Sequence, residues 1–371
     1  MMRNGKLGVV VFAAWLLASG SAGAHSNLRT RNVVLIVSDG LRWQEVFDGP
    51  EVGVMNNQSG GVSDPGGLRK EFLRQTPEES RQALMPFFWT VIARQGQLYG
   101  NRAKGSTAQV SNGLKFSYPG YNEMLVGYPD PRINRNGAGP NPNVTVFEWL
   151  NRMSEFHGRV AAFATWSVFT DIFNGERSGI YIYAGWNPVE ARKLTPKLAL
   201  LQELRATTPQ LWEGNIYDSF LQASLKEHIP ADRPRVLFVG YGETDEWAHS
   251  GRYDLYLRSA HHFDQFVADL WNTMQSLRQY KGKTTFVITT DHGRGRTAAD
   301  WKDHGRDIEG AEEVWIAVLG PDTPPLGERA RTAPATQGQV AATVAALLGK
   351  AYRQDVPAAA PPLPDATGLT H

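Results

Sequence analysis

Val33-Val-Leu-Ile-Val37 is followed directly by Ser38-Asp39-Gly40 near the start of the chain. A short apolar run of this length, bounded by turn residues, is typical of a buried strand. In open α/β sheets the ligand crevice lies beyond the carboxyl ends of the strands, so Asp39 is well placed for a metal ion. An aspartate before a glycine is also common in simple turns, so this reading depends on partners elsewhere in the chain.

Four further apolar runs resemble the first, at residues 160–164, 236–239, 285–289 and 314–319. We interpret all five as buried parallel strands. Segments with helical character lie between or beside them, at residues 81–94, 143–152, 253–277 and 339–348. Strands that alternate with helices predict an α/β fold, a three-layer sandwich with a mostly parallel sheet and helices on both faces.

Acidic and imidazole side chains follow two of the later runs. Asp245 and His249 come after residues 236–239 and are four positions apart, so a helical turn would place both on one face, close enough to share a metal ion. Asp291 and His292 are adjacent after residues 285–289, and His304 follows twelve positions later. For any one of these residues taken alone, a surface pair or a core histidine is the simpler interpretation.

Three strand ends thus each supply a carboxylate, and two also supply imidazoles. Mixed histidine and carboxylate ligands favour zinc, with manganese as the second choice, whereas oxygen ligands alone would favour calcium or magnesium. Three carboxylates and one seryl alkoxide would balance the charge of two divalent ions. The sequence therefore predicts two divalent metal ions in a nearly neutral site that accepts an anionic substrate.

Ser117 is the candidate nucleophile. Pro119 suits the first turn of a helix, which we expect to run to about Val126. Ser117 would then lie at a helix N-terminus, where backbone N–H groups favour anions. A divalent cation lowers the pKa of a serine hydroxyl and so activates it as a nucleophile. The alternative is an ordinary helix-capping serine.

These motifs, in this order, resemble the alkaline phosphatase superfamily. That group includes alkaline phosphatases, nucleotide pyrophosphatase/phosphodiesterases, phosphonoacetate hydrolases, cofactor-independent phosphoglycerate mutases and sulfatases. The resemblance covers residues 32–350 and implies two ligand sets. One ion would be held by Asp39, Ser117, Asp291 and His292. The other would be held by Asp245, His249 and His304.

Two departures from the superfamily patterns narrow the expected activity. Tyr121 stands where the sulfatase signature has an arginine, and the second ligand set is rich in imidazoles, so a typical sulfatase is disfavoured. The short gap between His292 and His304 is similar to that of the mutases and compact phosphatases. An export signal argues against a glycolytic mutase, whose substrate is cytosolic.

The predicted reaction is hydrolysis of a small-molecule phosphate ester in two steps, with a phosphoseryl intermediate on Ser117. We favour a phosphomonoesterase, because Lys115, Arg294 and Asn122 could bind the non-bridging oxygens of phosphate. A phosphodiesterase is the close alternative, with an aromatic wall formed by residues such as Trp166 and Trp247. A non-catalytic, exported metal-binding protein is the remaining possibility.

The first 24 residues have the pattern of a secretory signal peptide. Arg3 and Lys6 precede an apolar run at residues 7–18, and Ala22-Gly-Ala24 forms a cleavage site. We therefore expect a periplasmic or secreted protein without a stable membrane anchor, although an uncleaved anchor is the alternative. The chain has no cysteine, which excludes disulfides and thiolate metal ligands. Its formal charge of +1 argues against binding nucleic acid through bulk charge.

The predicted catalytic domain extends over residues 25–355. Within it, residues 166–230 contain many aromatic side chains and are a candidate insertion that shapes the substrate pocket, unless these aromatics belong to the core. Residues 356–371 are mostly alanine and proline, which predicts a disordered tail.

Overall fold

The computed structural model describes residues 28–188 and 194–367. The predicted signal peptide lies outside these residues. None of the helices described is both long enough and apolar enough to cross a lipid bilayer.

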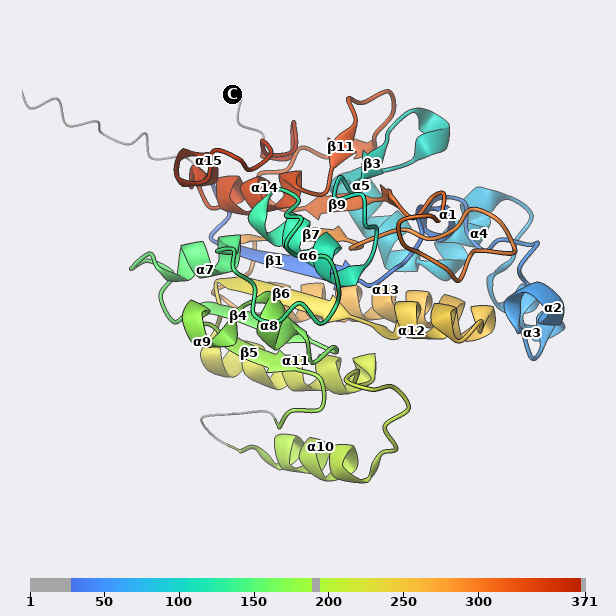
Figure 1. The fold of residues 1–371 in the computed structure, drawn as a ribbon, viewed down its shortest axis with the longest axis horizontal. Helices are drawn as coiled ribbons and strands as arrows, with labels where there is room; N and C mark the ends of the chain where they lie inside the picture. The colour runs from blue at the N-terminus through green and yellow to red at the C-terminus, as the bar shows by residue number, and fades with distance from the viewer. Residues whose placement is uncertain (1–27, 189–193, 368–371) are drawn as a thin grey trace, which may run out of the picture.

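An eight-stranded sheet forms the centre of the fold, with the strand order β10-β2-β9-β7-β1-β6-β4-β5 (Figure 1). β1 (Asn32–Ser38) lies in the middle and pairs in parallel with both β6 (Val236–Tyr241) and β7 (Thr284–Thr289). The remaining strands of this sheet are β2 (Gln97–Tyr99), β4 (Val160–Ala164), β5 (Tyr181–Ala184), β9 (Ile316–Leu319) and β10 (Gly327–Glu328). The predicted α/β class and the mostly parallel sheet are confirmed.

One strand prediction needs correction. Residues 314–319 do not form one parallel strand, because β9 runs antiparallel to β7, and residue Val314 belongs to a second sheet. That small sheet has the order β11-β3-β8, with β3 (Ala108–Gln109), β8 (Glu313–Val314) and β11 (Ala335–Thr336). Trp315 lies between the two strands, fully buried, and its indole N–H donates to the carbonyl oxygen of Leu41. Trp315 is therefore held in place at the residue where the chain passes from the small sheet to the large one.

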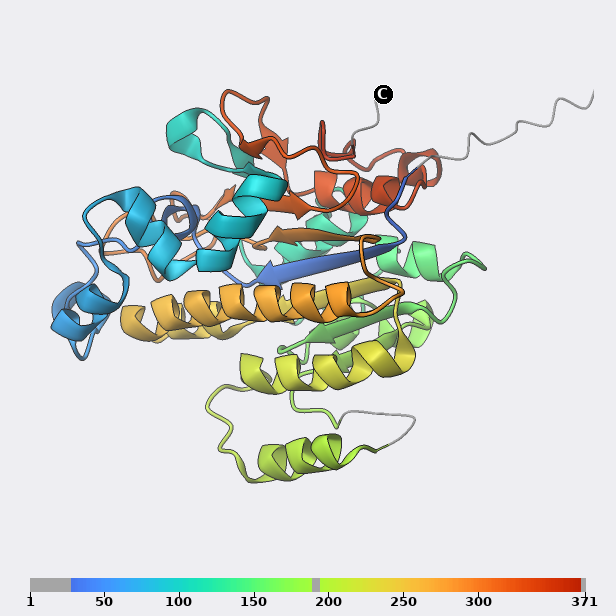
Figure 2. The same ribbon diagram turned by 180° about the vertical axis from the view of Figure 1, so that it is seen from behind.

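Helices cover both faces of the large sheet, as Figures 1 and 2 show from opposite sides. Alternate side chains of β1 point to opposite faces: Val34 and Ile36 pack in one hydrophobic cluster, and Val33, Leu35 and Val37 pack in the other. The first cluster involves α1 (Trp43–Phe47), α3 (Pro65–Phe72), α4 (Pro77–Leu84), η1 (Phe88–Ile92), α11 (Asp218–Asp232), α12 (Glu243–His249) and α13 (Tyr253–Ser276). The second involves α6 (Ser117–Val126), α7 (Val146–Asn151), α8 (Phe169–Ile172), α14 (Gln339–Leu347) and α15 (Tyr352–Asp355).

Several short helices lie at the periphery. They are α2 (Asn57–Gly60), α5 (Ala93–Gln95), η2 (Arg102–Lys104) and α9 (Gly175–Ser178). The longer helix α10 (Pro196–Thr207) lies against α11, at the lower edge of Figure 1. Its buried residue Leu198 joins the first cluster, whereas Leu200 and Leu204 are exposed.

The predicted disordered tail is wrong for residues 356–367. Ala359, Leu363 and Ala366 are buried in the second cluster. The backbone also joins the body of the protein, since the amide of Ala360 donates to the carbonyl oxygen of Gly127 at 2.8 Å. Small apolar side chains spaced along a proline-rich segment therefore suffice to pack it. Residues 368–371 lie outside the described part of the chain.

A buried carboxylate in α13 couples folding to pH. Asp264 accepts hydrogen bonds from the backbone amides of Phe87 at 2.8 Å and Phe88 at 2.7 Å, at the start of η1. Burial raises the pKa of Asp264 to about 7, and the two amide donors only partly oppose this effect. The folded state therefore binds a proton that the unfolded state releases near pH 4, so this contribution to stability is lost as pH rises from about 4 through 7.

We expect Asp264→Asn to remove this pH dependence, because asparagine stays neutral. Between pH 4 and pH 8 the unfolding free energy of the wild type should fall relative to the variant by roughly 3–4 kcal/mol. Chemical denaturation of both proteins across this range measures the difference and cancels the effects of other groups. A gap between the two proteins that stays constant with pH would show that Asp264 keeps an ordinary pKa.

Candidate active site

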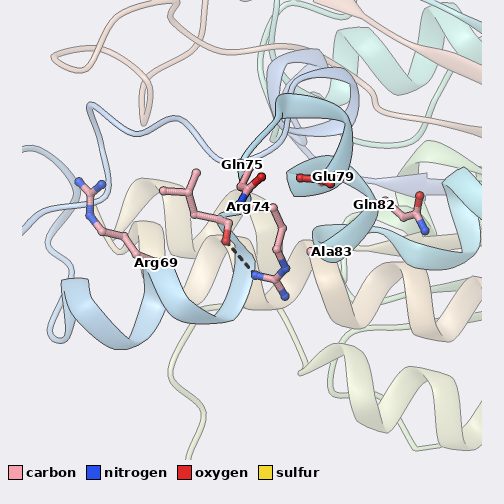
Figure 3. A pocket seen from close by; sticks show the side chains of 7 residues that line it. Arg69, Arg74, Gln75, Glu79, Gln82 and Ala83 are labelled. Carbon is pink, nitrogen blue, oxygen red and sulfur yellow. Dashed lines mark hydrogen bonds between the residues drawn. The ribbon is translucent and has the colours of Figure 1, made fainter.

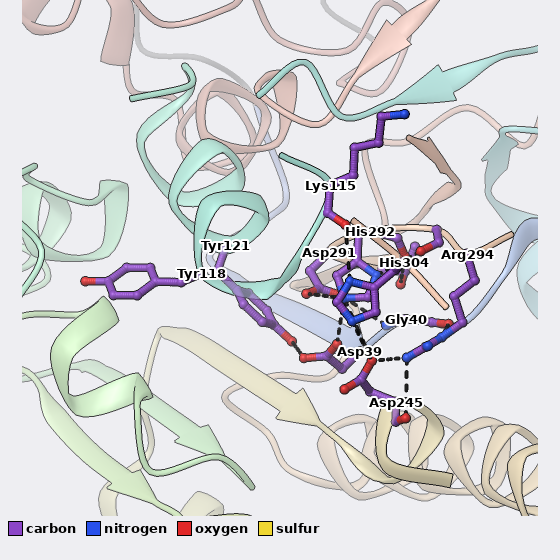
Figure 4. Close-up of polar contacts among 12 residues, drawn as sticks. Asp39, Gly40, Lys115, Tyr118, Tyr121, Asp245, Asp291, His292, Arg294 and His304 are labelled. Atoms are coloured by element: carbon purple, nitrogen blue, oxygen red, sulfur yellow. Dashed lines mark hydrogen bonds and ion pairs between the residues drawn. The ribbon is translucent and has the colours of Figure 1, made fainter. Parts of the chain in front are cut away.

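The carboxyl ends of the central strands bring distant acidic residues together. Asp39 follows β1, Asp291 follows β7, and Asp245 lies in α12, directly after β6. Figure 4 shows these three side chains converging, with His292 and His304 among them. Asp39 and Asp291 are buried, and Asp245 is largely so. The predicted convergence at one edge of the sheet is thus what the structure has.

His292 joins two groups of donor atoms. Its Nε2 atom lies 3.3 Å from Asp39 Oδ1 and 3.5 Å from Asp291 Oδ2, which makes the first group. The same atom lies 3.9 Å from Asp245 Oδ1, and His304 Nε2 lies 3.8 Å from that oxygen. Asp245, His292 and His304 therefore form a second group able to hold a metal ion.

His249 adjoins the second group. Its Nε2 atom lies 3.3 Å from Asp245 Oδ2 and 3.0 Å from His304 Nε2. The i, i+4 spacing in α12 places His249 and Asp245 on one helix face, as the sequence predicted. His249 is the most exposed member, with 47% of its side chain accessible, so this side of the cluster opens to solvent.

The donor atoms of the first group fit a metal ion. Asp39 Oδ1, Asp291 Oδ2 and His292 Nε2 are buried and have no hydrogen-bond partner among the described residues. Buried polar atoms are nearly always paired, so three unpaired atoms that face one another fit the coordination of a cation. Oxygen and imidazole nitrogen together are the ligand chemistry of zinc.

Electrostatics lead to the same conclusion. Burial raises the pKa of Asp291 well above its usual range, and the neighbouring Asp39 carboxylate raises it further. Burial alone would lower the pKa of His292, but the Asp291 and Asp39 carboxylates outweigh it and raise this pKa to about 9. His292 with its raised pKa and the buried Arg294 both face these carboxylates, and a divalent cation at the cluster would displace the proton of His292.

Backbone and hydroxyl groups hold the cluster in place. The hydroxyl of Tyr121 donates to Asp39 Oδ2 at 2.9 Å, and the amide of Gly40 donates to Asp291 Oδ1 at 3.0 Å. His292 Nδ1 lies 2.9 Å from its neighbour's carbonyl oxygen, at Gly293. Because Nδ1 contacts the backbone, Nε2 is directed toward the carboxylates; a hydrogen bond to one ring nitrogen commonly orients the other nitrogen of a histidine ligand in this way.

Ser117 lies at the same cavity, as the first residue of α6. The helix ends at Val126, as predicted, and Phe116 takes the capping position without a side-chain hydrogen bond, so Ser117 is not a capping serine. A cavity of about 210 Å³ is lined by Ser117 together with Asp39, Asp245 and His249. The first turn of α6 packs closely on the metal-binding loop, because a Cβ at Gly120 would lie 2.4 Å from the Asp291 carbonyl oxygen.

A chain of contacts fixes the loop before Ser117. The buried carboxylate of Glu123 accepts from the amide of Ser111 and from Asn112 Nδ2, the latter at 3.0 Å. Asn112 Oδ1 in turn accepts from the amide of Lys115 at 2.9 Å, which holds Lys115 at a φ of 58°. The Lys115 carbonyl oxygen then lies 3.3 Å from His304 Nδ1. The loop therefore positions both the candidate nucleophile and one imidazole.

The three predicted substrate-binding side chains do not line this cavity. Lys115 Nζ forms an ion pair with Glu312 at 2.9 Å, and its side chain points away from the cluster in Figure 4. Arg294 is buried and pairs with Asp245. Asn122 is buried on another side of α6, where its Oδ1 accepts from Asn143 at 3.1 Å.

Other residues line the cavity that the sequence did not single out as site residues. They are Asn136, Thr165, Glu213, Asn215 and Glu246, among others. Trp166, considered only as part of a possible aromatic wall, also lines it, and so does Phe169, whereas Trp247 does not. An isolated β-bridge joins Trp166 to Asn215, so the segment at residues 166–230 reaches the cavity at its start and again at Asn215. Its aromatic richness was the signal that pointed to this region.

A larger, open hollow of about 910 Å³ lies elsewhere, beside α3 and α4 (Figure 3). Its lining is Arg69, Leu73, Arg74, Gln75, Glu79, Gln82 and Ala83. None of the candidate metal-binding groups in the described parts of the chain touches it. The chemistry therefore belongs to the smaller cavity.

Comparisons with known proteins give a family model that matches part of the chain and solved structures with a similar fold. A family model described as Metalloenzyme superfamily matches residues 215–351. Wild-type alkaline phosphatase PafA has a similar fold, with a TM-score of 0.58 at 10% identity, over 92% of this chain and 99% of that one. The phosphonate monoester hydrolase SpPMH from Silicibacter pomeroyi gives a TM-score of 0.56 at 13% identity, over 92% and 78% of the two chains. No curated protein sequence matches the chain.

The chain thus shares its fold with an alkaline phosphatase and a phosphonate monoester hydrolase, and residues 215–351 match the metalloenzyme family model. The matched family model and the fold shared with an alkaline phosphatase confirm the resemblance to the alkaline phosphatase superfamily. Members of that superfamily are hydrolytic metalloenzymes.

Proposed function

We propose that this protein hydrolyses phosphate esters whose reacting phosphorus carries one negative charge, namely phosphodiesters, with Ser117 as the nucleophile. The observation that carries the proposal is the lining of the cavity. Among its described residues there is no lysine or arginine, whereas Glu213 and Glu246 add carboxylates to the metal-binding cluster. Beyond the metal ions, a monoester dianion in such a cavity would meet these carboxylates with no lysine or arginine to offset its second charge.

This proposal revises the monoester preference suggested by the sequence. That preference depended on Lys115 and Arg294 as extra cations, and both are engaged with Glu312 and Asp245 instead. A diester has one charge fewer and a second organic group, for which Trp166 and Phe169 offer an apolar wall. The charge of the cavity and its apolar lining thus both favour a diester over a monoester.

In this reaction the Ser117 oxygen forms a bond to phosphorus, and the bond from phosphorus to the leaving oxygen breaks. Water then hydrolyses the phosphoseryl ester and restores the serine. Two divalent ions would be held by the first group, which contains Asp39, and by the second group, which contains Asp245. They would activate the Ser117 hydroxyl and neutralise charge on the leaving oxygen. Asn136 Oδ1 accepts from the amide of Tyr118 at 3.1 Å, which leaves its amino group to donate to a non-bridging oxygen.

The test compares kcat/KM of the zinc-loaded protein for three substrates with the same leaving group: bis-p-nitrophenyl phosphate, p-nitrophenyl phosphate and p-nitrophenyl sulfate. We expect the diester to be cleaved at least tenfold faster than the monoester. Faster cleavage of the monoester would restore the phosphomonoesterase interpretation. A sulfate ester also carries a single charge, so fastest cleavage of the sulfate would assign a sulfatase. No cleavage of any of the three would favour a metal-binding role.

A further inference from the structure

The wall of the cavity beside His249 carries negative charge that the metal ions would not use. Glu213 and Glu246 line the cavity, but neither belongs to a group able to hold a metal ion among the described residues. Two divalent ions would balance the three aspartates and the seryl oxygen. Arg294, which pairs with Asp245, offsets one of the two glutamates, so the loaded cavity still keeps a net negative charge. An anionic substrate would bind more tightly in such a cavity if another part of the substrate carried a positive charge.

These glutamates belong to a wall built from three segments. Glu246 follows Asp245 in α12, and its Oε1 accepts from Asn215 Nδ2 at 2.5 Å. Asn215 is bridged to Trp166 through the backbone, and Asn215 Oδ1 is buried without a hydrogen-bond partner among the described residues. Glu246, Asn215 and Trp166 are thus connected, and Glu213, two residues before Asn215, lines the same cavity.

From this wall we infer that the organic group next to the reacting phosphorus carries an ammonium cation. Carboxylates and the face of a tryptophan are the groups that attract ammonium ions, and a quaternary ammonium needs no hydrogen-bond acceptor at close range. A substrate with one phosphate charge and one ammonium charge is neutral overall, which removes the penalty of entering a negative cavity. The inference rests on the proposed phosphodiesterase function and names the class of its substrate.

The test uses two diesters of the same shape and leaving group. One is p-nitrophenylphosphorylcholine, and the other is its uncharged isostere, p-nitrophenyl 3,3-dimethylbutyl phosphate. We expect the wild type to favour the choline ester by roughly tenfold in kcat/KM. Equal kcat/KM values for the two esters would overturn the inference and leave the diesterase proposal intact. If neither diester is hydrolysed, the proposed function itself fails.

The variant Glu213→Gln/Glu246→Gln keeps the shape of the wall and removes its charge. We expect its preference for the choline ester to fall to about onefold. The matched control is Glu203→Gln, an exposed glutamate of α10 in the same insertion, which should keep the wild-type preference. A preference that survives in the double variant would overturn the assignment of these glutamates.

A measurement on the wild type covers the case in which the double variant does not fold. Tetramethylammonium chloride should inhibit cleavage of the uncharged isostere more strongly than sodium chloride at the same ionic strength. Equal inhibition by the two salts would contradict an ammonium site in the wall.

Discussion

Replacing Ser117 by alanine is expected to lower kcat/KM for diester hydrolysis by on the order of 10⁴-fold, because no other hydroxyl occupies its place at the cavity. The serine is 5% exposed and begins α6 without acting as its cap. Alanine is smaller and favours helix, so the fold should remain intact. Steady-state kinetics with the p-nitrophenyl substrates, together with far-UV circular dichroism, measures both quantities.

Ser178→Ala is the matched control for this prediction. Ser178 is also a buried serine, its hydroxyl has no hydrogen-bond partner among the described residues, and it lies at the end of α9. Its removal should leave the rate unchanged. A Ser117→Ala protein that retained more than about a tenth of wild-type activity would show that hydrolysis proceeds by direct attack of water, with no phosphoseryl intermediate.

The sequence predicted the core strands well because each is buried on both faces. A strand between two helical layers is apolar at every position, so the run at residues 160–164 coincides with β4, and the run at 285–289 lies within β7. Such an apolar run indicates that a strand is buried, but not whether the strand runs parallel or antiparallel to its neighbours. The antiparallel course of β9 depends on its partner β7 and on the buried Trp315, which no local pattern reveals.

The convergence of the candidate metal ligands was predictable for the same reason. Their position directly after buried strands places them at one edge of the sheet, whatever the details of the loops. Substrate contacts were not predictable from nearness in sequence. Asn122 lies five positions after Ser117, which at 100° per residue turns it well away from the serine on α6. Lys115 forms an ion pair with Glu312, and Arg294 forms one with Asp245. Both partners lie far away in the sequence, so these pairs could not be predicted from it.

Removing the metal ions is expected to abolish hydrolysis and to lower the melting temperature. After the ions are removed, the buried carboxylates of Asp39 and Asp291 face each other. Burial and the neighbouring Asp39 carboxylate both disfavour a negative charge on Asp291, which destabilises the folded protein. A tightly bound ion stabilises the folded state by roughly 4 kcal/mol when its concentration is a thousand times its Kd. For a chain of this size that corresponds to a fall of about 5–10 °C after chelation. Differential scanning calorimetry with and without chelator measures it.

Two variants separate the loss of metal from general destabilisation. Asp291→Asn removes one buried charge and one ligand, so its melting temperature should respond much less to chelator than that of the wild type. Asp130→Asn also removes a buried carboxylate, but this carboxylate pairs with Arg132 at 2.6 Å and lies outside the cluster. The variant should therefore lower stability and keep the full response of the melting temperature to chelator.

Re-addition of zinc, manganese, magnesium or calcium one at a time then identifies the ion that restores hydrolysis. If chelator changed neither the rate of hydrolysis nor the melting temperature of the wild type, the unpaired atoms of Asp39, Asp291 and His292 would hold no cation.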